Sequence, residues 1–300
     1  MKYQEFTIKK DYKTIYYFLK DEGFAENFIT NLRKTWGNLK VNSEIVNIRK
    51  ALKAGDKLEI NSNPNSKTTI TQCILPLDVV YEDKYYLLLN KESGLSCMPS
   101  RSHYTHNLAG AICNYMKDKD DNFVLRIINR LDKDTAGIII VAKDSISANK
   151  LKDIQKTYHA ICEGEIKDKI TINKKIKTIT NNGINEHKRI ISDDGQDAIT
   201  HITPISHNKD YSLLSITLEH GRTHQIRLHL SSIDHPLLGD ELYGSKSDLI
   251  NHTVLLCKQI SFYHPYLEKK LNFEVDYPED FKNLINIREP NCKKNKKSIR

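Results

Sequence analysis

Apolar residues near the start of the chain recur at helical spacing and are followed by short runs with the spacing of strands. The helical set returns about every fourth position, which places its members on one face of a helix: Phe24, Phe28, Ile29, Leu32 and Trp36. After it come a turn at 42–43, a tight turn at 55–56 and a strand at 57–60. The polar segment 61–68 contains a proline and is interpreted as a linker. These patterns predict a small α+β domain at 1–65.

From residue 75 the chain becomes rich in strand patterns. Four runs have the length and composition of strands: 85–90, 138–142, 158–166 and 213–218. Helical patterns occur at 107–117 and 145–155, and the Lys- and Asn-rich stretch 167–195 is typical of a hairpin excursion or a loop. Because strands and helices do not alternate regularly, we predict an α+β fold for 75–290. Its central sheet is expected to be mixed, largely antiparallel and flanked by helices and loops.

The positive charge of the chain is concentrated at its two ends. Of the net charge of +8, residues 1–70 carry +5 and residues 293–300 carry another +5, which leaves −2 for the body between them. Basic segments on a near-neutral body suit a catalytic domain that accessory segments hold on a polyanion. A solvated surface with a basic tail at 291–300 fits equally well, so charge alone does not decide between the two.

Several function classes lack the residues that they require. The longest apolar runs are too short to cross a bilayer, and the N-terminus lacks the apolar stretch of a signal peptide. The six cysteines form no CxxC pair, which argues against a zinc ribbon or a disulfide scaffold and for reduced thiols in the cytoplasm. His224 and His229 are five residues apart on a predicted helix and diverge, so no metal site is expected. Without a P-loop or a GxGxxG motif, we expect no cofactor.

The stretch INRLDKDTAG at 128–137 places two carboxylates at the start of an apolar strand. Asp132 and Asp134 are two positions apart and point to opposite sides of an extended segment, so they do not form an acid–base pair. Asp134 begins a turn and is expected to satisfy backbone N–H groups there. Asp132 is left as the candidate functional carboxylate. A surface turn with a loose Arg–Asp pair is the commoner meaning of this pattern when it is taken alone.

A second stretch, HGRTHQIRLHL at 220–230, follows an expected strand and opens a helix with Thr223 as its N-cap. An arginine at position 227 of this helix is costly to bury without an anion, and Asp132 is the obvious partner for Arg227. Such a pair would lower the pKa of Asp132 and keep the carboxylate ionised, as a nucleophile requires.

A third stretch, KTYHAICEGEI at 156–166, places Tyr158 on one face of a strand together with Ala160 and Cys162. A tyrosine that points into a cleft offers a stacking platform for a nucleobase. An ordinary core tyrosine is the alternative, and among the 15 tyrosines of the chain it is the default.

In order and spacing, these stretches resemble the RluA-type family of RNA pseudouridine synthases. The resemblance covers 75–285 and rests on five motifs: LDVVYEDKYYLLLNKESGL (77–95), NRLDKDTAGIIIVAKD (129–144), KTYHAICEGEI (156–166), GRTHQIRLHLSSIDHPLLGDELYG (221–244) and LLCKQISFYHPYLEKKLNFEVDYPEDF (255–281). The chain departs from the family pattern at Asn129, Ala136 and Glu92, where His, Ser and Pro are usual. Asn129 bears most on substrate geometry, because it precedes Arg130 in the loop.

The resemblance implies a pseudouridine synthase-like fold and an isomerase that acts on uridine in RNA without a cofactor. Asp132 is then the nucleophile and Arg227 its partner. Tyr158 stacks on the target uracil, and Arg130 helps to fill the space that the flipped nucleotide leaves. A non-catalytic RNA-binding or ribosome-assembly protein that keeps the fold is the alternative function. A hydrolase with a metal at the Asp pair would need a ligand cluster that the sequence does not offer.

The first domain resembles a degenerate S4-type RNA-binding module, through its helices, a VN-x-x-x-V strand and a GD-x-L-x-I strand. A small α+β cap is the alternative interpretation. The resemblance assigns RNA contacts to basic residues in both domains: Arg33, Lys34, Lys40, Arg49, Lys50, Arg222 and His224. The implied partner is RNA, with ribosomal RNA favoured over transfer RNA, and the protein is expected to act as a monomer away from membranes.

Overall fold

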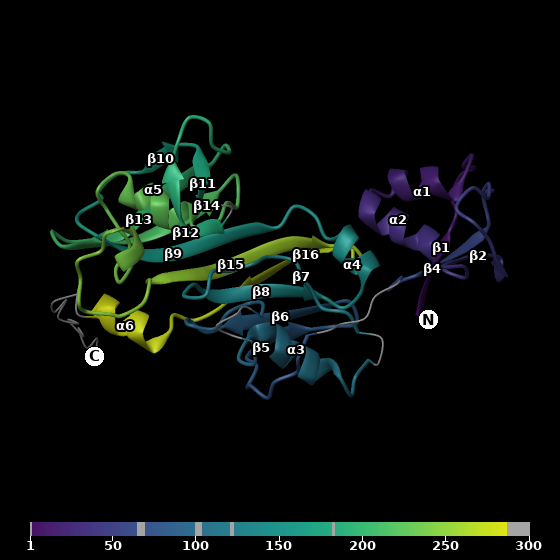
Figure 1. Cartoon of the computed structure of the whole chain (residues 1–300), viewed down its shortest axis with the longest axis horizontal. Coiled ribbons are helices and arrows are strands. Elements are labelled where there is room, and N and C mark those ends of the chain that lie inside the picture. Colours follow the sequence, from purple (N-terminus) through teal and green to yellow (C-terminus); the bar gives the residue numbers. More distant parts are fainter. Residues whose placement is uncertain (1, 65–69, 100–103, 121–122, 182–183, 287–300) are drawn as a thin grey trace, which may run out of the picture.

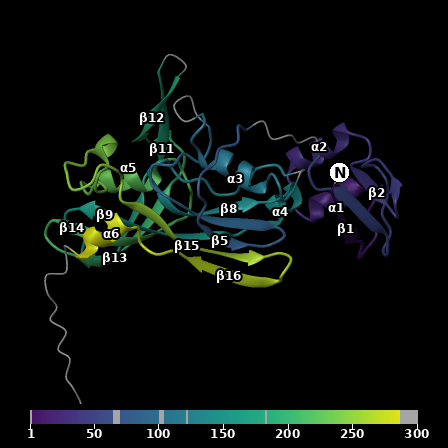
Figure 2. The same ribbon diagram turned by 90° about the horizontal axis from the view of Figure 1, so that it is seen from below.

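The chain folds into two units that lie end to end in an elongated molecule (Figure 1). The computed structural model describes residues 2–64, 70–99, 104–120, 123–181 and 184–286. The smaller N-terminal unit lies at one end, and the rest of the chain is built around one long sheet (Figures 1 and 2). Within these residues, no helix has both the length and the apolar composition needed to span a membrane.

The N-terminal unit is an antiparallel sheet covered by two helices. The strands run in the order β1-β4-β2-β3, and the elements are β1 (Tyr3–Thr7), α1 (Ile15–Asp21), α2 (Glu26–Lys34), β2 (Leu39–Val41), β3 (Glu44–Ile45) and β4 (Lys57–Asn61). Apolar side chains of both helices and of the sheet form one core. Asn42 and Ser43 between β2 and β3 have positive φ angles of 50° and 71°, which makes a tight hairpin turn. The helical pattern, this turn and the last strand are therefore confirmed.

Trp36 is the exception in the expected helical core. Its side chain is 69% exposed, whereas Phe28 and Leu32 are buried. Helix α2 ends at Lys34, and Thr35 has an extended backbone with φ −130° and ψ 126°. The prediction for Trp36 is wrong because helical spacing directs side chains to one face only while the helix continues.

The segment expected as a linker begins inside the folded unit. Asn61 is the last residue of β4, and its side chain donates to the side chain of Asn38 at 2.8 Å. Ser62 is also buried. Asn63 and Pro64 follow, and the remainder of the predicted linker, at 65–68, lies outside the described residues.

The large unit is built on a ten-stranded sheet. Eight strands run in the order β10-β13-β14-β9-β15-β8-β6-β5, while β16 pairs with β15 and β7 with β8. Their bounds are β5 (Val79–Glu82), β6 (Tyr86–Lys91), β7 (Arg126–Ile127), β8 (Ala136–Ala142), β9 (Gln155–Glu163), β10 (Ile170–Asn173), β13 (Ile199–His207), β14 (Tyr211–Leu218), β15 (Leu255–His264) and β16 (Lys269–Glu274). Among these described strands, β8 and β15 pair in parallel and the other pairs are antiparallel. The predicted α+β fold with a mixed, largely antiparallel sheet is confirmed.

The parallel pairing of β8 with β15 depends on Gly137. This residue has a φ of +110°, and a Cβ atom there would lie 2.3 Å from the carbonyl oxygen of Cys257. Glycine is required because another side chain would clash with the neighbouring backbone. The pairing places the beginning of β8, and the loop that precedes it, next to β15 and one strand away from β9.

Short helices and one hairpin complete the large unit. They are α3 (Leu108–Met116), α4 (Ser145–Lys150), α5 (Gln225–Ser231), a 3₁₀ turn (Glu241–Tyr243), α6 (Glu279–Asn286) and the hairpin of β11 (Ile176–Asn181) with β12 (Ile184–Ile191). The helices expected at 107–117 and 145–155 are present, although α4 is shorter than predicted because the backbone is already extended at Leu151, with φ −79° and ψ 113°. The hairpin expected within 167–195 is also present and stands out from the sheet (Figure 2).

Helix α4 joins the two units. The side chain of Ile146 is fully buried and belongs to the apolar core of the N-terminal unit. Beside it, the Ser145 N–H donates to the carbonyl of Ser62 at 3.0 Å. The Ala25 N–H donates to the side-chain oxygen of Asn149 at 2.8 Å. The N-terminal unit is therefore packed on the large unit through shared core and backbone contacts.

Replacement of Ile146 by Ala should loosen this junction. Truncation of a fully buried isoleucine costs about 2–5 kcal/mol of the free energy of unfolding, because it removes apolar contacts and leaves a cavity. Scanning calorimetry should show a lower Tm for the N-terminal unit. Ile146→Val is the matched control and should cost about 0.5–1.5 kcal/mol. An Ala variant with the wild-type calorimetric profile would show that the two units do not share a core.

Candidate active site

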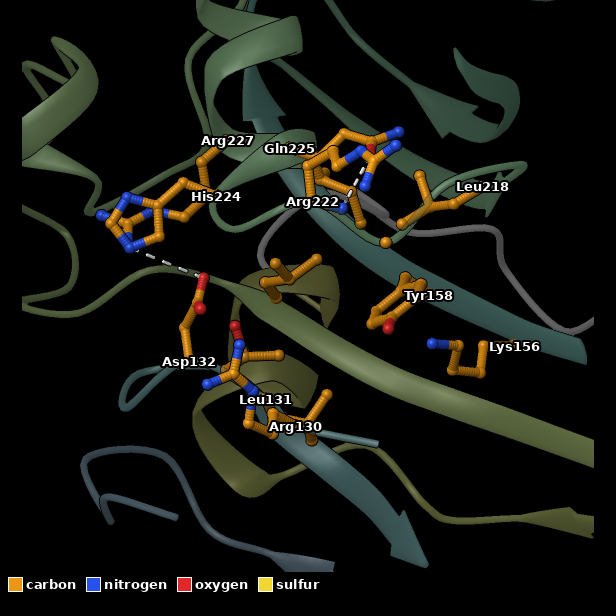
Figure 3. A pocket seen from close by; sticks show the side chains of 14 residues that line it. Arg130, Leu131, Asp132, Lys156, Tyr158, Leu218, Arg222, His224, Gln225 and Arg227 are labelled. Carbon is orange, nitrogen blue, oxygen red and sulfur yellow. Dashed lines mark hydrogen bonds and ion pairs between the residues drawn. The ribbon is translucent and has the colours of Figure 1, made fainter. Parts of the chain in front are cut away.

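A cavity opens where the loop before β8 meets strand β9 and the segment that leads into α5 (Figure 3). Its volume is about 80 Å³. A wider groove of about 670 Å³ shares the residues around Asp132 and extends to the hairpin strand β12. The cavity is lined by residues of all three sequence stretches singled out above, together with Leu218 of β14 and Leu255 of β15. The residues from the three stretches are Arg130, Leu131, Asp132, Thr135, Lys156, Tyr158, Gly221, Arg222, His224, Gln225, Ile226 and Arg227.

Asn129 fixes the start of the loop that carries Asp132. Its side-chain N–H donates to the carbonyl of Ile138 at 2.9 Å, and its side-chain oxygen accepts from the N–H of Ile140 at 2.8 Å. The side chain is buried, and both bonds go to the backbone of β8. Asn129 thus continues the pairing of β7 with β8 beyond Ile128, using its side-chain amide in place of a strand backbone. Asn129, one of the three residues that depart from the family pattern, therefore holds this loop.

A second anchor of the loop comes from the end of β6. The buried ammonium group of Lys91 donates to the carbonyls of Glu92 (2.8 Å), Leu95 (2.9 Å) and Lys133 (2.8 Å). Burial lowers the pKa of Lys91 to about 8, and nearby acidic groups that include Asp132 oppose this effect. The bond to Lys133 holds the backbone directly after Asp132.

A turn is present, but it begins at Asp132 and not at Asp134, because Ala136 and Gly137 already belong to β8. It is closed by the Thr135 N–H, which donates to the carbonyl of Asp132 at 3.2 Å. The carbonyl of Asp134 accepts from the hydroxyl of Ser93 at 2.8 Å. The backbone of Asp134 therefore contributes a further link between the loop and the segment after β6.

Asp132 stands at the rim of the cavity with 29% of its side chain exposed. Its Oδ2 atom lies 3.8 Å from Nε2 of His224 (Figure 3). Burial raises the pKa of Asp132 above its usual value, and the positive charges of Arg227 and Lys91 offset the rise only in part. The expectation of a lowered pKa is therefore wrong, because the loss of solvent outweighs the nearby cations.

Arg227 pairs with Asp240 and not with Asp132, contrary to the sequence-based expectation. Its Nε and Nη2 atoms donate to the two carboxylate oxygens of Asp240, each at 2.7 Å. The guanidinium carbon also lies 5.2 Å from the centre of the Tyr243 ring. The Asp240 side chain is fully buried, so this two-bond pair satisfies a charge that would otherwise lack a partner. Arg227 acts on Asp132 through its electric field, which opposes the rise in the pKa of Asp132.

Tyr158 lies across the cavity from Asp132 (Figure 3). It is on β9, between Ile216 of β14 and Cys257 of β15. The residue is 7% exposed, and burial raises its pKa well above the usual value. The hydroxyl therefore keeps its proton at neutral pH, and the ring is an uncharged surface that lines the cavity.

Helix α5 begins one residue later than the sequence predicts. Its N-cap is His224, with φ 57° and ψ 19°, and the expected N-cap, Thr223, is an exposed residue of the preceding loop. Gln225 is the first residue of the helix, and its side-chain oxygen accepts from the Arg222 N–H at 3.0 Å. The N-cap prediction is wrong because the left-handed backbone that precedes the helix is at His224, one residue after Thr223.

The wider groove is lined by basic side chains from four separate segments: Arg130, Lys133, Lys156, Arg189 and Arg222. Of these, Arg130 and Arg222 are expected from the sequence to contact RNA. Lys156 and Arg189 become neighbours of the site only through the folding of β9 and β12. In the described part of the chain, no three His, Cys, Asp or Glu side chains converge as metal ligands do.

The basic residues predicted to bind RNA in the N-terminal unit line neither the cavity nor the groove. They are Arg33, Lys34, Lys40, Arg49 and Lys50. Lys40 pairs with Glu59 at 3.6 Å, and Arg33 lies over the Tyr16 ring at 5.2 Å from its centre. The other three are exposed. RNA binding by these residues stays a prediction.

Two residues of the site, Lys91 and Asp240, were not predicted although the sequence carries a signal for each. Lys91 directly follows the apolar run YYLLLN, and a charge at the end of a buried strand signals a specific partner. Asp240 follows the short apolar run PLL with a single glycine between them. Neither signal names the partner, because Lys91 and Lys133 are 42 residues apart in the chain.

Asn129→Ala should destabilise the protein without opening a large cavity. The substitution leaves the Ile138 carbonyl and the Ile140 N–H without their partner, and an unsatisfied buried polar group costs about 1–3 kcal/mol. Urea unfolding should show a loss of that size. Asn251 is exposed, so Asn251→Ala is the control and should change the free energy of unfolding by less than about 0.5 kcal/mol. Equal effects of the two substitutions would contradict the role of Asn129.

Asp132→Asn should stabilise the fold at neutral pH. A carboxyl group whose pKa is raised in the folded state binds its proton more tightly when folded, so its ionisation opposes folding above its unfolded pKa. The amide removes that penalty, and its Tm should exceed the wild-type Tm at pH 7. The difference should shrink as the pH falls below the folded pKa and disappear below the unfolded pKa of about 4. Tm values measured from pH 3 to pH 8 test this, and a less stable variant at pH 7 would contradict it.

Comparison with known sequences places these features in one family. A family model described as RNA pseudouridylate synthase matches residues 85–232. The chain is 32% identical over 281 residues to the uncharacterized RNA pseudouridine synthase YjbO of Bacillus subtilis, with 91% of this chain and 98% of that protein covered. It is 34% identical over 255 residues to the uncharacterized RNA pseudouridine synthase YhcT of the same organism, with coverage of 82% and 83%.

Another relative carries a more specific name. The ribosomal large subunit pseudouridine synthase D of Zymomonas mobilis is 32% identical over 235 residues, which cover 71% of this chain and 73% of that protein. Among solved structures, the human RNA pseudouridylate synthase domain containing 4 aligns with a TM-score of 0.55 at 22% identity, over 70% of this chain and 92% of the other. The human protein named domain containing 1 aligns with the same TM-score at 20% identity, over 71% and 86%. These two likenesses establish the fold.

Proposed function

This chain belongs to the RNA pseudouridine synthase family, and we propose that Asp132 is the carboxylate with which it isomerises specific uridines of a structured RNA. One observation carries the proposal. Asp132 and Tyr158, which come from separate sequence motifs, face each other across one cavity that opens into a basic groove. A nucleotide in that cavity would have a carboxylate on one side and an aromatic ring on the other.

The chemistry of pseudouridine formation requires little more than a carboxylate and a pocket. The bond from N1 of uracil to C1′ of the ribose breaks, and a bond from C5 to C1′ forms. C5 loses its proton and N1 gains one, so no atom or electron is lost overall. The carboxylate either attacks the nucleotide or removes a proton from its sugar, and both routes require the ionised form of Asp132. Its raised pKa makes that carboxylate a stronger base than an ordinary aspartate.

The target base must leave its stack to reach Asp132. Extrusion of a nucleotide costs a few kcal/mol, which contacts to the flipped base and to the remaining strand must offset. Tyr158 supplies a stacking surface inside the cavity. Arg130 lines both the cavity and the groove, where it is suited to occupy the space that the base vacates.

The basic groove supports a path for the RNA backbone on either side of the target. Arg130, Lys133, Lys156, Arg189 and Arg222 gather there, and phosphate contacts from such residues supply much of the affinity for RNA. The net charge of the chain, +8, acts in the same direction. The resulting affinity depends strongly on the salt concentration.

Ribosomal RNA is the proposed substrate, ahead of transfer RNA. Support comes from the relatives named as ribosomal large subunit pseudouridine synthases, and from the additional basic residues of the N-terminal unit. That unit, with the proposed S4-like role, would contact a second part of a large RNA. We propose that the protein acts in the cytoplasm as a monomer.

Asp132→Asn should abolish pseudouridine formation and leave RNA affinity within about twofold of wild type, because the amide keeps the shape but cannot ionise. Total RNA from a strain that lacks this protein is incubated with purified enzyme. Pseudouridine is then located by reverse-transcription stops after treatment with a selective reagent, since it has the same mass as uridine.

The matched control is Asp134→Asn, which removes a carboxylate from the same loop and should retain activity. Conversion by the Asp132→Asn enzyme at a near wild-type rate would sink the assignment of Asp132. If neither the wild type nor the variants form pseudouridine at any position of total RNA, the result would support a non-catalytic RNA-binding protein.

A further inference from the structure

His224 is held in an uncommon backbone conformation at the rim of the cavity. Its φ of 57° and ψ of 19° lie in the left-handed region, which few residues other than glycine adopt and which is concentrated at functional sites. The role of N-cap does not account for the side chain, because the imidazole makes no capping hydrogen bond to α5. The ring instead faces the carboxylate of Asp132 (Figure 3).

A chain of hydrogen bonds orients the imidazole. The backbone N–H of Arg189 on β12 donates to the hydroxyl oxygen of Tyr243 at 2.8 Å. That hydroxyl lies 3.0 Å from Nδ1 of His224. Because the Tyr243 oxygen already accepts the Arg189 N–H, its own proton is available for Nδ1. Neutral His224 then carries its proton on Nε2, the atom that faces Oδ2 of Asp132 at 3.8 Å.

Two other cations near Asp132 are directed elsewhere. Nε and Nη2 of Arg227 donate to Asp240, and the Lys91 ammonium donates to three backbone carbonyls. Arg227 acts on Asp132 through its charge alone, whereas Lys91 also holds the backbone after Asp132 through its bond to Lys133. Nε2 of His224, in contrast, faces Oδ2 of the carboxylate at 3.8 Å, and the Tyr243 hydroxyl contacts Nδ1 on the other side of the ring.

We propose that His224 is a positioning residue for Asp132: its Nε2–H donates to Oδ2 of the carboxylate in the RNA complex, which leaves Oδ1 for the nucleotide. Hydrogen bonds of this kind are often long in free enzymes and shorten when substrate is bound. The inference rests on the proposed function of Asp132. It replaces the expectation that His224 binds RNA directly.

Hydrogen bonds also connect the basic groove to the side chain that faces the carboxylate of Asp132. The side chain of Arg189 lines the groove, while its backbone N–H bonds to the Tyr243 hydroxyl that orients His224. RNA that settles against β12 therefore holds the same segment that holds the imidazole. Tyr243 is buried, and its ring meets that of His224 edge-on at 5.6 Å, so displacement of one ring displaces the other.

The ring tautomer provides a test that needs no activity. The ¹⁵N chemical shifts of the histidine rings are measured in the full-length, RNA-free protein at a pH high enough for imidazole to be neutral. The His224 signals are identified by their loss in His224→Gln. The expected result is the form with the proton on Nε2. In Tyr243→Phe, which lacks the hydroxyl that donates to Nδ1, that preference should weaken. A wild-type ring with its proton on Nδ1 would overturn the proposal.

Kinetics of variants test the consequence for the reaction. His224→Gly suits the left-handed backbone, so the fold should be retained while the imidazole is lost. With total RNA from a strain that lacks this protein, the single-turnover rate at saturating enzyme should fall about 10- to 100-fold, the effect of one hydrogen bond to a charged group. The enzyme concentration that gives half the maximal rate should stay within about twofold. Added imidazole should restore part of the rate, and His224→Gln, which keeps an N–H donor, should retain more activity than the Gly variant.

Two outcomes of these kinetics would overturn the proposal. A His224→Gly enzyme with an unchanged maximal rate and weaker RNA binding would make His224 an RNA contact. The role of His224 would be structural if His224→Gly is slow, added imidazole does not restore its rate, and His224→Gln is no faster than His224→Gly. The side chain of His201 on β13 is 43% exposed and lines neither the cavity nor the groove, so His201→Gln is the control and should match wild type. Failure of wild type to form pseudouridine would sink the proposed function of the site, while the tautomer measurement would still report on the contact.

Discussion

The buried ammonium group of Lys91 is the interaction on which the site most depends. A buried charge must find hydrogen-bond acceptors, and Lys91 takes one of its three from Lys133, the residue directly after Asp132. Asn129 holds the other end of the same loop through two bonds to β8. A loop with this many charged residues would otherwise be solvated and mobile. Fixed at both ends, it carries one carboxylate to the rim of a cavity in a defined orientation.

The second constraint is electrostatic. Asp132 has cations nearby, but Arg227 is bonded to the fully buried Asp240 and not to Asp132. A direct pair with arginine would stabilise the carboxylate and make it a weaker base. The field of a cation that is bonded elsewhere limits the rise in pKa without occupying the carboxylate oxygens. The site thus keeps an aspartate that is costly to ionise in the folded protein, as is common for groups at functional sites.

Local pattern predicted the elements well and their partners poorly. The strand at β8 and the hairpin turn at Asn42 were open to prediction because side-chain period and turn chemistry are local properties. Trp36 shows where this fails, since the end of α2 decides which way the side chain points. The choice of Asp240 over Asp132 as the partner of Arg227 depends on which carboxylate is more deeply buried in the tertiary structure, and no spacing in the sequence expresses that.

The sequence by itself determined the α+β class, the resemblance that names the family, and the residue types of the candidate site: a carboxylate in a turn before a strand, a tyrosine on a strand, and an Arg- and His-rich helix start. Tertiary structure decided which of these groups touch. It placed His224 at Asp132, turned Arg227 toward Asp240, and brought Lys156 and Arg189 to the groove. The physical reason is that residue type and periodicity are properties of a short stretch of sequence. The partner of a charged side chain and its pKa depend instead on burial and on distances between segments far apart in the chain.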